Sequence, residues 1–239
     1  MTLDNLQRSL AAMTDAAELW PALFGHFREH GAVWLQYSMS ELLHAGDEEP
    51  AAPMVWSAAP AWEGVMLARL RGDPLAEMAL ARGTPSGWGG AGAPGVARQP
   101  ESYRRLPGPG LVFGVFGPGL RHGLVFAGFA ASPAKDTAAA LQLAAQAAHQ
   151  RHCAISGHPV EPRGGLSRRE REVLDLIALG KSNGVMAELL GLSRHTVDTL
   201  VRRIFAKFGV RDRTALVLAG IASGILQAGS GGIVTRLRD

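Results

Sequence analysis

The apolar positions of the first thirty residues recur with the period of an α-helix. Two segments, residues 3–13 and 16–30, show this pattern, and in the second one Leu19, Leu23 and Phe27 fall on one face. The chain is therefore predicted to open with two helices, each with one apolar face.

The pattern then changes to the two-residue period of a β-strand. In residues 32–40 apolar and polar positions alternate, which places Val33 and Tyr37 on the same face. Two later apolar segments, residues 111–117 and 123–131, flank a short Pro-Gly turn. Such a pair predicts a β-hairpin within a sheet.

Helical segments surround these strands. Residues 61–82 have a helical pattern that is interrupted at Asp73-Pro74, where Asp73 is suited to cap the next helix and Pro74 to its first position. Residues 83–95 are too glycine-rich for a regular element, whereas residues 136–152 predict a long helix. An α+β fold follows, with a small antiparallel sheet and helices in an α/β/α arrangement.

The C-terminal part is predicted to be an independent, all-α domain of four helices. Two prolines and three glycines mark residues 155–165 as a linker between residues 1–154 and residues 166–228. Residues 229–239 are predicted to form a flexible tail. Ser167 and Glu170 form a capping-box pattern ahead of the first helix.

The second and third of these helices predict a helix-turn-helix. They span roughly residues 182–190 and 193–208, and Gly191 lies in the turn between them. In this motif the later helix enters the major groove of double-stranded DNA.

A helical projection of residues 193–208 separates an apolar face from a polar one. Arginine on such a face reads guanine or binds phosphate, and threonine contacts base edges. The residues predicted to face DNA are Arg194, His195, Asp198, Thr199, Arg202 and Arg203.

The charge distribution agrees with a DNA-binding C-terminal domain and an N-terminal domain of another function. Residues 1–165 hold 12 Lys and Arg against 14 Asp and Glu, whereas residues 166–226 hold 10 against 6. The basic part is thus the compact C-terminal one, as expected for a unit that binds a polyanion.

Composition excludes several classes of protein. With 47% hydrophobic and 19% charged residues, and no apolar run of the roughly 20 residues that a membrane span needs, a globular cytoplasmic protein is expected. The single cysteine, Cys153, excludes an internal disulfide. No phosphate-loop or nucleophile-turn motif occurs, so neither an enzyme, a cofactor nor a metal site is predicted.

The segment from LSRREREVLDLIALGKSN to FAKFGVRDRTALV closely resembles the DNA-binding domain of LuxR-type regulators. Asp73-Pro74 followed by Trp88 also resembles the acyl-homoserine-lactone-binding domain of quorum-sensing receptors. The resemblance implies an α+β sensing domain at residues 1–154 that binds a small-molecule autoinducer, and a homodimer.

The same resemblance implies roles for individual residues. Asp73 would accept the amide N–H of the lactone, and Trp88 would line the cavity. Trp62, with Trp56 as the second candidate, would supply the indole for the lactone carbonyl, and Tyr37 would line the cavity from the first strand.

Alternatives stay open at this point. Asp73 as a plain helix cap and the tryptophans as plain core residues need no ligand. A LuxR-type regulator that senses another small molecule or none, and a partner protein that does not bind DNA, also fit the sequence. Val185, Leu200 and Asp198 depart from the usual residues of the DNA-binding domain.

Overall fold

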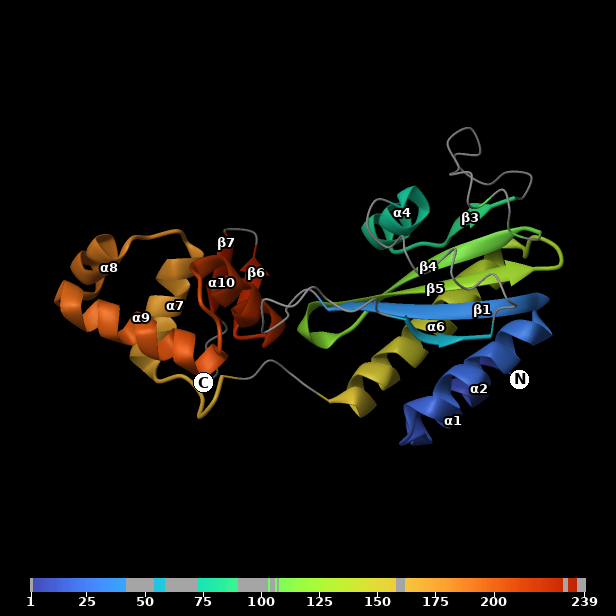
Figure 1. Ribbon diagram of the computed structural model, residues 1–239, viewed down its shortest axis with the longest axis horizontal. Coiled ribbons are helices and arrows are strands. Elements are labelled where there is room, and N and C mark those ends of the chain that lie inside the picture. Colours follow the sequence, from blue (N-terminus) through green and yellow to red (C-terminus); the bar gives the residue numbers. More distant parts are fainter. Residues whose placement is uncertain are drawn as a thin grey trace. The chain divides into compact units, whose positions relative to one another are not determined.

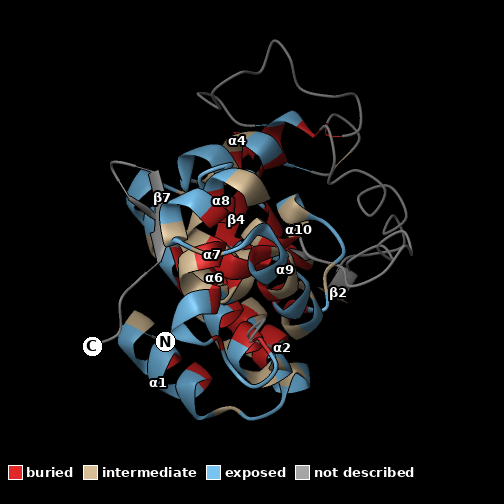
Figure 2. Cartoon of the chain, turned by 90° about the vertical axis from the view of Figure 1, so that its left-hand side faces the viewer, coloured by how far each residue is buried: buried red, intermediate tan, exposed pale blue. Residues whose placement is uncertain are grey.

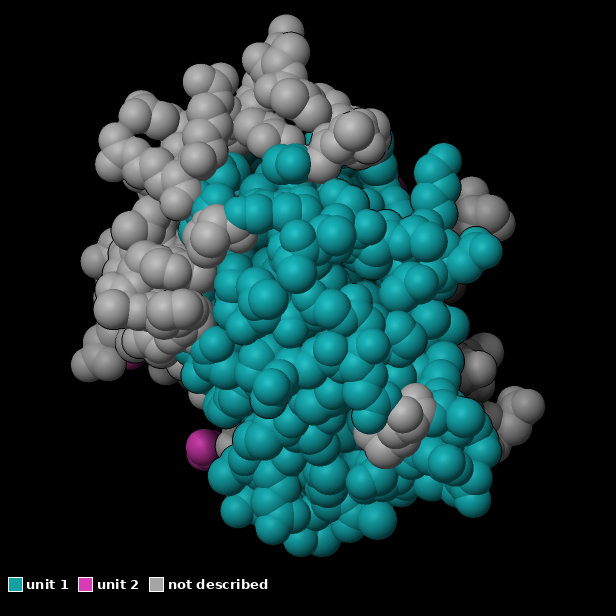
Figure 3. Space-filling view, turned by 90° about the vertical axis from the view of Figure 1, so that its right-hand side faces the viewer, with its two compact units in different colours: residues 1–41, 49–117, 121–157 teal, residues 42–48, 118–120, 158–239 magenta. Residues whose placement is uncertain are grey.

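The computed structural model of the protein divides into two compact units. Residues 1–41, 49–117 and 121–157 belong to the N-terminal unit, which is drawn in teal in Figure 3. Residues 158–239 form most of the C-terminal unit. The residues that the structure describes are 2–41, 54–58, 73–89, 103, 106, 108–157, 162–229 and 232–235.

The N-terminal unit is built on a five-stranded antiparallel sheet with the order β2-β1-β5-β4-β3. Its strands are β1 (Ala32–Glu41), β2 (Met54–Ser57), β3 (Ser86–Trp88), β4 (Gly110–Phe116) and β5 (Arg121–Phe129). The first strand and the hairpin are as the sequence predicts. Strand β3 was not predicted: it lies within the stretch expected to be irregular. Its three residues, paired to β4, are too few to show the two-residue period of a strand.

Helices cover both faces of this sheet (Figure 1). On one face α1 (Leu3–Ala12), α2 (Ala16–Glu29) and α6 (Lys135–Ser156) enclose a large apolar core. On the other face α4 (Pro74–Arg82) packs over a smaller cluster. The predicted α/β/α arrangement is confirmed, and Figure 2 shows the buried residues on the inward sides of the helices.

Strand β1 distributes its side chains between the two cores. Leu35 and Tyr37 pack into the large core, whereas Trp34 belongs to the cluster under α4. Val33 does not share the Tyr37 face as predicted: it is 54% exposed, because the register with β5 shifts between Ala32 and Trp34. A one-residue shift moves a side chain to the other face of a strand.

Glutamine side chains of α6 hydrogen-bond the backbone groups of β4 at its edge, where β3 no longer pairs with it. Gln142 Nε2 donates to the Gly114 carbonyl at 2.8 Å, and Gln146 bonds both the N–H and the carbonyl of Phe116. These bonds replace a missing neighbouring strand and fix α6 to the sheet.

The C-terminal unit contains the four predicted helices, and side chains cap each of them. Ser167, Ser182, Ser193 and Asp212 accept from backbone N–H groups in the first turns. The helices are α7 (Arg168–Ala178), α8 (Asn183–Leu190), α9 (Arg194–Phe208) and α10 (Arg213–Ala222).

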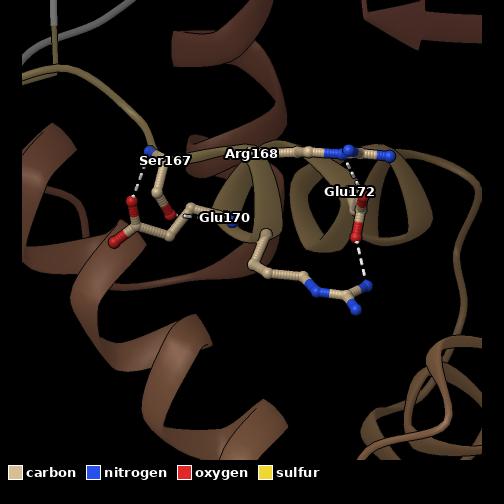
Figure 4. A network of polar contacts seen from close by, with 5 residues as sticks. Ser167, Arg168, Glu170 and Glu172 are labelled. Carbon is tan, nitrogen blue, oxygen red and sulfur yellow. Dashed lines mark hydrogen bonds and ion pairs between the residues drawn. The ribbon is translucent and has the colours of Figure 1, made fainter.

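The capping box before α7 also ties two helices together. Ser167 Oγ accepts from the Glu170 N–H, and Glu170 Oε2 accepts from the Ser167 N–H at 2.7 Å (Figure 4). The buried Glu170 carboxylate is paired with Lys207 Nζ of α9, also at 2.7 Å. Burial opposes ionisation, but the bonds to Lys207 and Ser167 prevail and lower the pKa of Glu170.

The tail after α10 differs from the prediction. A hairpin of β6 (Leu226–Gly229) and β7 (Gly232–Thr235) replaces part of the expected flexible segment, so the unit is not entirely helical. Leu226 anchors the hairpin, because its side chain is buried against Gly220, where an added Cβ would lie 2.6 Å from Leu226 Cδ1. A short alternating segment after a glycine-rich stretch gave too weak a signal to predict this.

In the part of the chain that the structure describes, no helix is both long and apolar enough to cross a membrane.

Candidate functional sites

Helix α9 presents a basic outer face. Arg194, His195, Arg202 and Arg203 are exposed, while Val197, Leu200, Val201, Ile204 and Phe208 are buried in the core of the unit. The two faces are those that the sequence predicts. Ser193 caps the helix at its first turn, where base-contacting residues of a recognition helix lie.

Thr199 and Arg202 interact on this outer face. The Thr199 hydroxyl donates to the His195 carbonyl at 3.0 Å and lies 3.4 Å from an amino group of Arg202. The Arg202 guanidinium therefore keeps most of its donors available for bases or phosphates.

Asp198 is half-buried and takes part in a polar network beside the turn of the motif. Asn183 Nδ2, at the start of α8, donates to Asp198 Oδ1 at 2.5 Å. The side-chain oxygen of Asn183, Oδ1, accepts from Arg213, which also donates to the backbone carbonyl of Lys181 at 2.7 Å. Asp198 thus takes part in a link between α8, α9 and α10.

Two substitutions at Asp198 separate its charge from its hydrogen bond. Asp198→Asn keeps an oxygen for Asn183, so stability should be nearly unchanged while non-specific DNA affinity rises through the loss of one negative charge. Asp198→Ala leaves the Asn183 amide without its acceptor and should cost about 1 kcal/mol of unfolding free energy. Urea denaturation and salt-dependent DNA titration measure the two effects. Equal stability of both variants would contradict the network.

The second site lies on the sheet face under α4 and centres on Asp73. This carboxylate caps α4: Oδ1 accepts from the N–H groups of Leu75 and Ala76 at 2.9 and 3.0 Å. Its other oxygen, Oδ2, accepts from the Tyr103 hydroxyl at 2.7 Å. Asp73 is only 8% exposed, and a carboxylate still has capacity for one further donor at Oδ2.

Aromatic rings continue the site from Asp73 across the sheet. The ring of Tyr103 lies 5.1 Å from that of Trp88, which stacks on Trp34 at 5.8 Å. Gly110 and Gly128, paired with each other across β4 and β5, provide the floor beneath the two indoles. An added Cβ at Gly110 would lie 2.0 Å from the Trp88 ring, so glycine is required for this packing.

Of the five residues predicted to bind ligand, the structure brings together two, Asp73 and Trp88, through Tyr103. Trp62 lies outside the described residues. Trp56 pairs with Tyr37 across β1 and β2, and its ring lies 6.0 Å from Phe24 of α2. It therefore belongs to the opposite face of the sheet from Asp73.

Tyr37 is also on the opposite face, inside the large core. Its ring stacks on Trp20 at 3.6 Å, and its hydroxyl lies 2.7 Å from His149 Nδ1. Burial raises the pKa of Tyr37 and keeps the phenol neutral. The prediction that Tyr37 lines the same site as Asp73 is wrong, because alternation places it under the helices.

Sequence reasoning missed Trp34 and Tyr103. The alternation of β1 could have indicated Trp34, because residues 34, 36 and 38 lie on the opposite face of the strand from Tyr37. No local pattern marks Tyr103, which reaches Asp73 from 30 positions further along the chain.

Residues 165–219 match the family described as bacterial regulatory proteins of the luxR family. The C-terminal unit is a LuxR-type DNA-binding domain. The probable transcriptional regulatory protein NarL of Mycobacterium tuberculosis is 44% identical over 68 residues, 28% of this chain and 31% of that protein. YxjL of Bacillus subtilis, also a transcriptional regulatory protein, is 41% identical over 70 residues, 29% of this chain and 32% of that protein.

These matches cover only about a third of each relative, so they describe the LuxR-type domain alone. Both relatives are named as transcriptional regulatory proteins, and these names agree with the prediction of a regulator and not an enzyme.

Solved structures of SdiA share the fold of nearly the whole chain. Escherichia coli SdiA superposes with a TM-score of 0.63 over 93% of this chain and 98% of its own, at 17% identity. SdiA in complex with octanoyl-rac-glycerol gives 0.60 over 93% and 94%, at 19% identity. The predicted fold, an α+β unit followed by the LuxR-type domain, is confirmed.

Proposed function

We propose that the protein is a transcriptional regulator that binds double-stranded DNA through α9 and is controlled by a small molecule bound under α4. The observation that carries the DNA-binding role is the exposed basic face of α9 in a LuxR-type domain. The arginines on this face have the donors that base edges and phosphates require. In the cell we place this regulator in the cytoplasm, with access to DNA.

Arg202→Ala is expected to weaken specific DNA binding by about 1 to 3 kcal/mol, because a guanidinium near base edges contributes this much. Arg168→Ala is the matched control: its side chain on α7 is 94% exposed and paired with Glu172, so only a small, salt-dependent loss is expected. Gel-shift titrations against genomic fragments at fixed salt measure both. Equal losses for the two variants would remove Arg202 from the interface.

For the N-terminal unit we propose an N-acyl-homoserine lactone as the ligand, sensed as an autoinducer in quorum sensing. In this proposal Asp73 Oδ2 accepts the amide N–H of the ligand, and the indole N–H of Trp88 donates to a ligand carbonyl. The Trp88 Nε1 atom is buried and bonded to none of the described residues. A buried donor without a partner is costly, and a ligand carbonyl relieves that cost.

The SdiA structure with octanoyl-rac-glycerol supports an acylated ligand in this fold, and acylglycerols are therefore the second class to test. Both classes combine a polar head with an acyl chain. We also propose that the regulator acts as a homodimer, with α6, on which Leu143 is 56% exposed, as one candidate contact surface.

Asp73→Asn should reduce ligand affinity by roughly ten-fold or more while changing the stability of the free protein by less than about 1 kcal/mol. Asparagine caps a helix as well as aspartate does, but it no longer offers a charged acceptor to the ligand amide. Glu77→Gln, one turn later on the exposed side of α4, removes the same charge as a control. Thermal melts with and without lactone measure the ligand effect, and equal stabilisation of all three proteins would refute the assignment.

A further inference from the structure

The two faces of β1 differ in polarity although both are buried. Toward the large core β1 presents Leu35 and Tyr37, whose hydroxyl is bonded to His149. Toward α4 it presents Gln36 and Ser38, which are only 2% and 4% exposed. Buried polar side chains are retained where something needs their hydrogen bonds.

The strand register arranges the face under α4 into rows that run across the sheet. The first row places a tryptophan at each end and glycines between them. The second row has polar ends, and the third begins with a serine. In chain pairing these rows are Trp34–Gly128–Gly110–Trp88, Gln36–Phe126–Val112–Ser86 and Ser38–Leu124–Gly114.

Helix α4 covers the far end of the third row. An added Cβ at Gly114 would lie 2.6 Å from the Ala79 carbonyl oxygen, so the helix backbone rests directly on β4 there. Ser38 lies at the other end of this row, on β1, and Leu124 separates it from that contact. Neither Gly114 nor Leu124 has a side chain that can bond the serine hydroxyl.

The Trp88 indole nitrogen in the first row and Ser38 Oγ in the third are both buried on this face. Neither atom has a hydrogen-bond partner among the residues that the structure describes. Four residues along a strand correspond to roughly 13 Å, which is the spacing between the first and third rows. Trp88 and Ser38 also lie at opposite ends of their rows, on β3 and β1, so a ligand that reaches both must cross the sheet diagonally.

We infer that the ligand sensed under α4 carries a second hydrogen-bonding group, a hydroxyl or carbonyl in its tail, which pairs with Ser38. This inference rests on the proposed sensing function and narrows its ligand class. With the head at Asp73 and Trp88, the tail crosses the Phe126–Val112 row and ends beside Ser38. A plain alkyl tail of that length would leave the serine hydroxyl desolvated and unpaired, which opposes binding.

The first test needs no ligand. If Ser38 Oγ awaits a ligand, Ser38→Ala in the full chain should melt at or above the temperature of the parent, because the substitution removes an unpaired buried hydroxyl. Ser9→Ala, exposed on α1, is the neutral control. A lower melting temperature for Ser38→Ala alone would mean that the protein itself already satisfies the hydroxyl, and the inference would be overturned.

The second test uses two matched pairs of probes: octanoyl and ω-hydroxyoctanoyl homoserine lactone, and the same two acyl groups on glycerol. Calorimetric titration of the full chain should show roughly ten-fold tighter binding of the hydroxylated member of a pair. Ser38→Ala should abolish that preference, whereas Trp88→Phe should weaken both members of the pair alike.

The outcomes distinguish this inference from the function on which it rests. Tighter binding of the plain octanoyl probe, or a preference that survives in Ser38→Ala, overturns the tail assignment and leaves acyl-ligand sensing in place. Binding of none of the four probes overturns both.

Discussion

Gly128→Ala should lower the unfolding free energy of the N-terminal unit by about 1 to 3 kcal/mol, the usual cost of overpacking a well-packed core. A Cβ at this position would lie 1.9 Å from Trp34 Nε1 and 2.3 Å from Cε2, so the indole must leave its place on the sheet. Because Trp34 stacks on Trp88, its displacement should also weaken ligand binding.

The same change elsewhere provides the control. Gly25 lies inside α2, and an added Cβ there meets no atom within 4 Å, so Gly25→Ala should stabilise the helix by up to about 1 kcal/mol. The double variant Trp34→Leu with Gly128→Ala should recover part of the loss, because the smaller side chain clears the added methyl group. Chemical denaturation measures all of these variants. Additive effects at positions 34 and 128 would contradict the contact.

The helices of both units could be predicted because their signals are local. Asp73 before Pro74, Ser167 with Glu170, and Ser193 before α9 are caps whose partners lie within three residues. The exposed basic side of α9 follows from the same helical geometry. The proposal that this side faces DNA rests on the family match and on charge.

The face that we propose to bind the ligand could be predicted only in part, because strand pairing creates it. The neighbouring Pro74 marks Asp73 as a helix cap, but its partner Tyr103 is distant in the chain. The prediction for Tyr37 is wrong, since alternation shows which residues share a face and not which core that face meets. The pairing of Gly110 with Gly128 is likewise visible only once the register is known.

Acid should destabilise the protein well before its carboxylates are protonated, and His149 is the main reason. Burial lowers the pKa of His149 to about 4, and the hydrogen bond to the Arg121 carbonyl offsets this only in part. Its Nδ1 lies 2.7 Å from the Tyr37 hydroxyl and its Nε2 lies 3.2 Å from the Arg121 oxygen. A neutral ring that donates from Nε2 and accepts at Nδ1 satisfies both bonds.

The sign of the effect follows from comparing the two states. An unfolded histidine has a pKa of about 6.5, so below this pH the unfolded chain takes up a proton that folded His149 resists. The stabilisation is complete above pH 6.5 and is lost as the pH falls toward 4. The shift corresponds to about 3 kcal/mol of unfolding free energy. Burial also lowers the pKa values of His152, His122 and His26, which add to the loss in the same direction.

His149→Gln isolates the contribution of this ring, because glutamine cannot titrate. The variant should lose stability at pH 7, where it breaks the bond to Tyr37, but its stability should fall less steeply between pH 6.5 and 4.5 than that of the parent. His195→Gln, at an exposed position of α9, is the matched control for the substitution itself. Urea denaturation at a series of pH values gives the three slopes. If parent and His149→Gln were parallel across this window, His149 would be charged in the folded protein, and its bond to the Arg121 carbonyl would be that of an imidazolium.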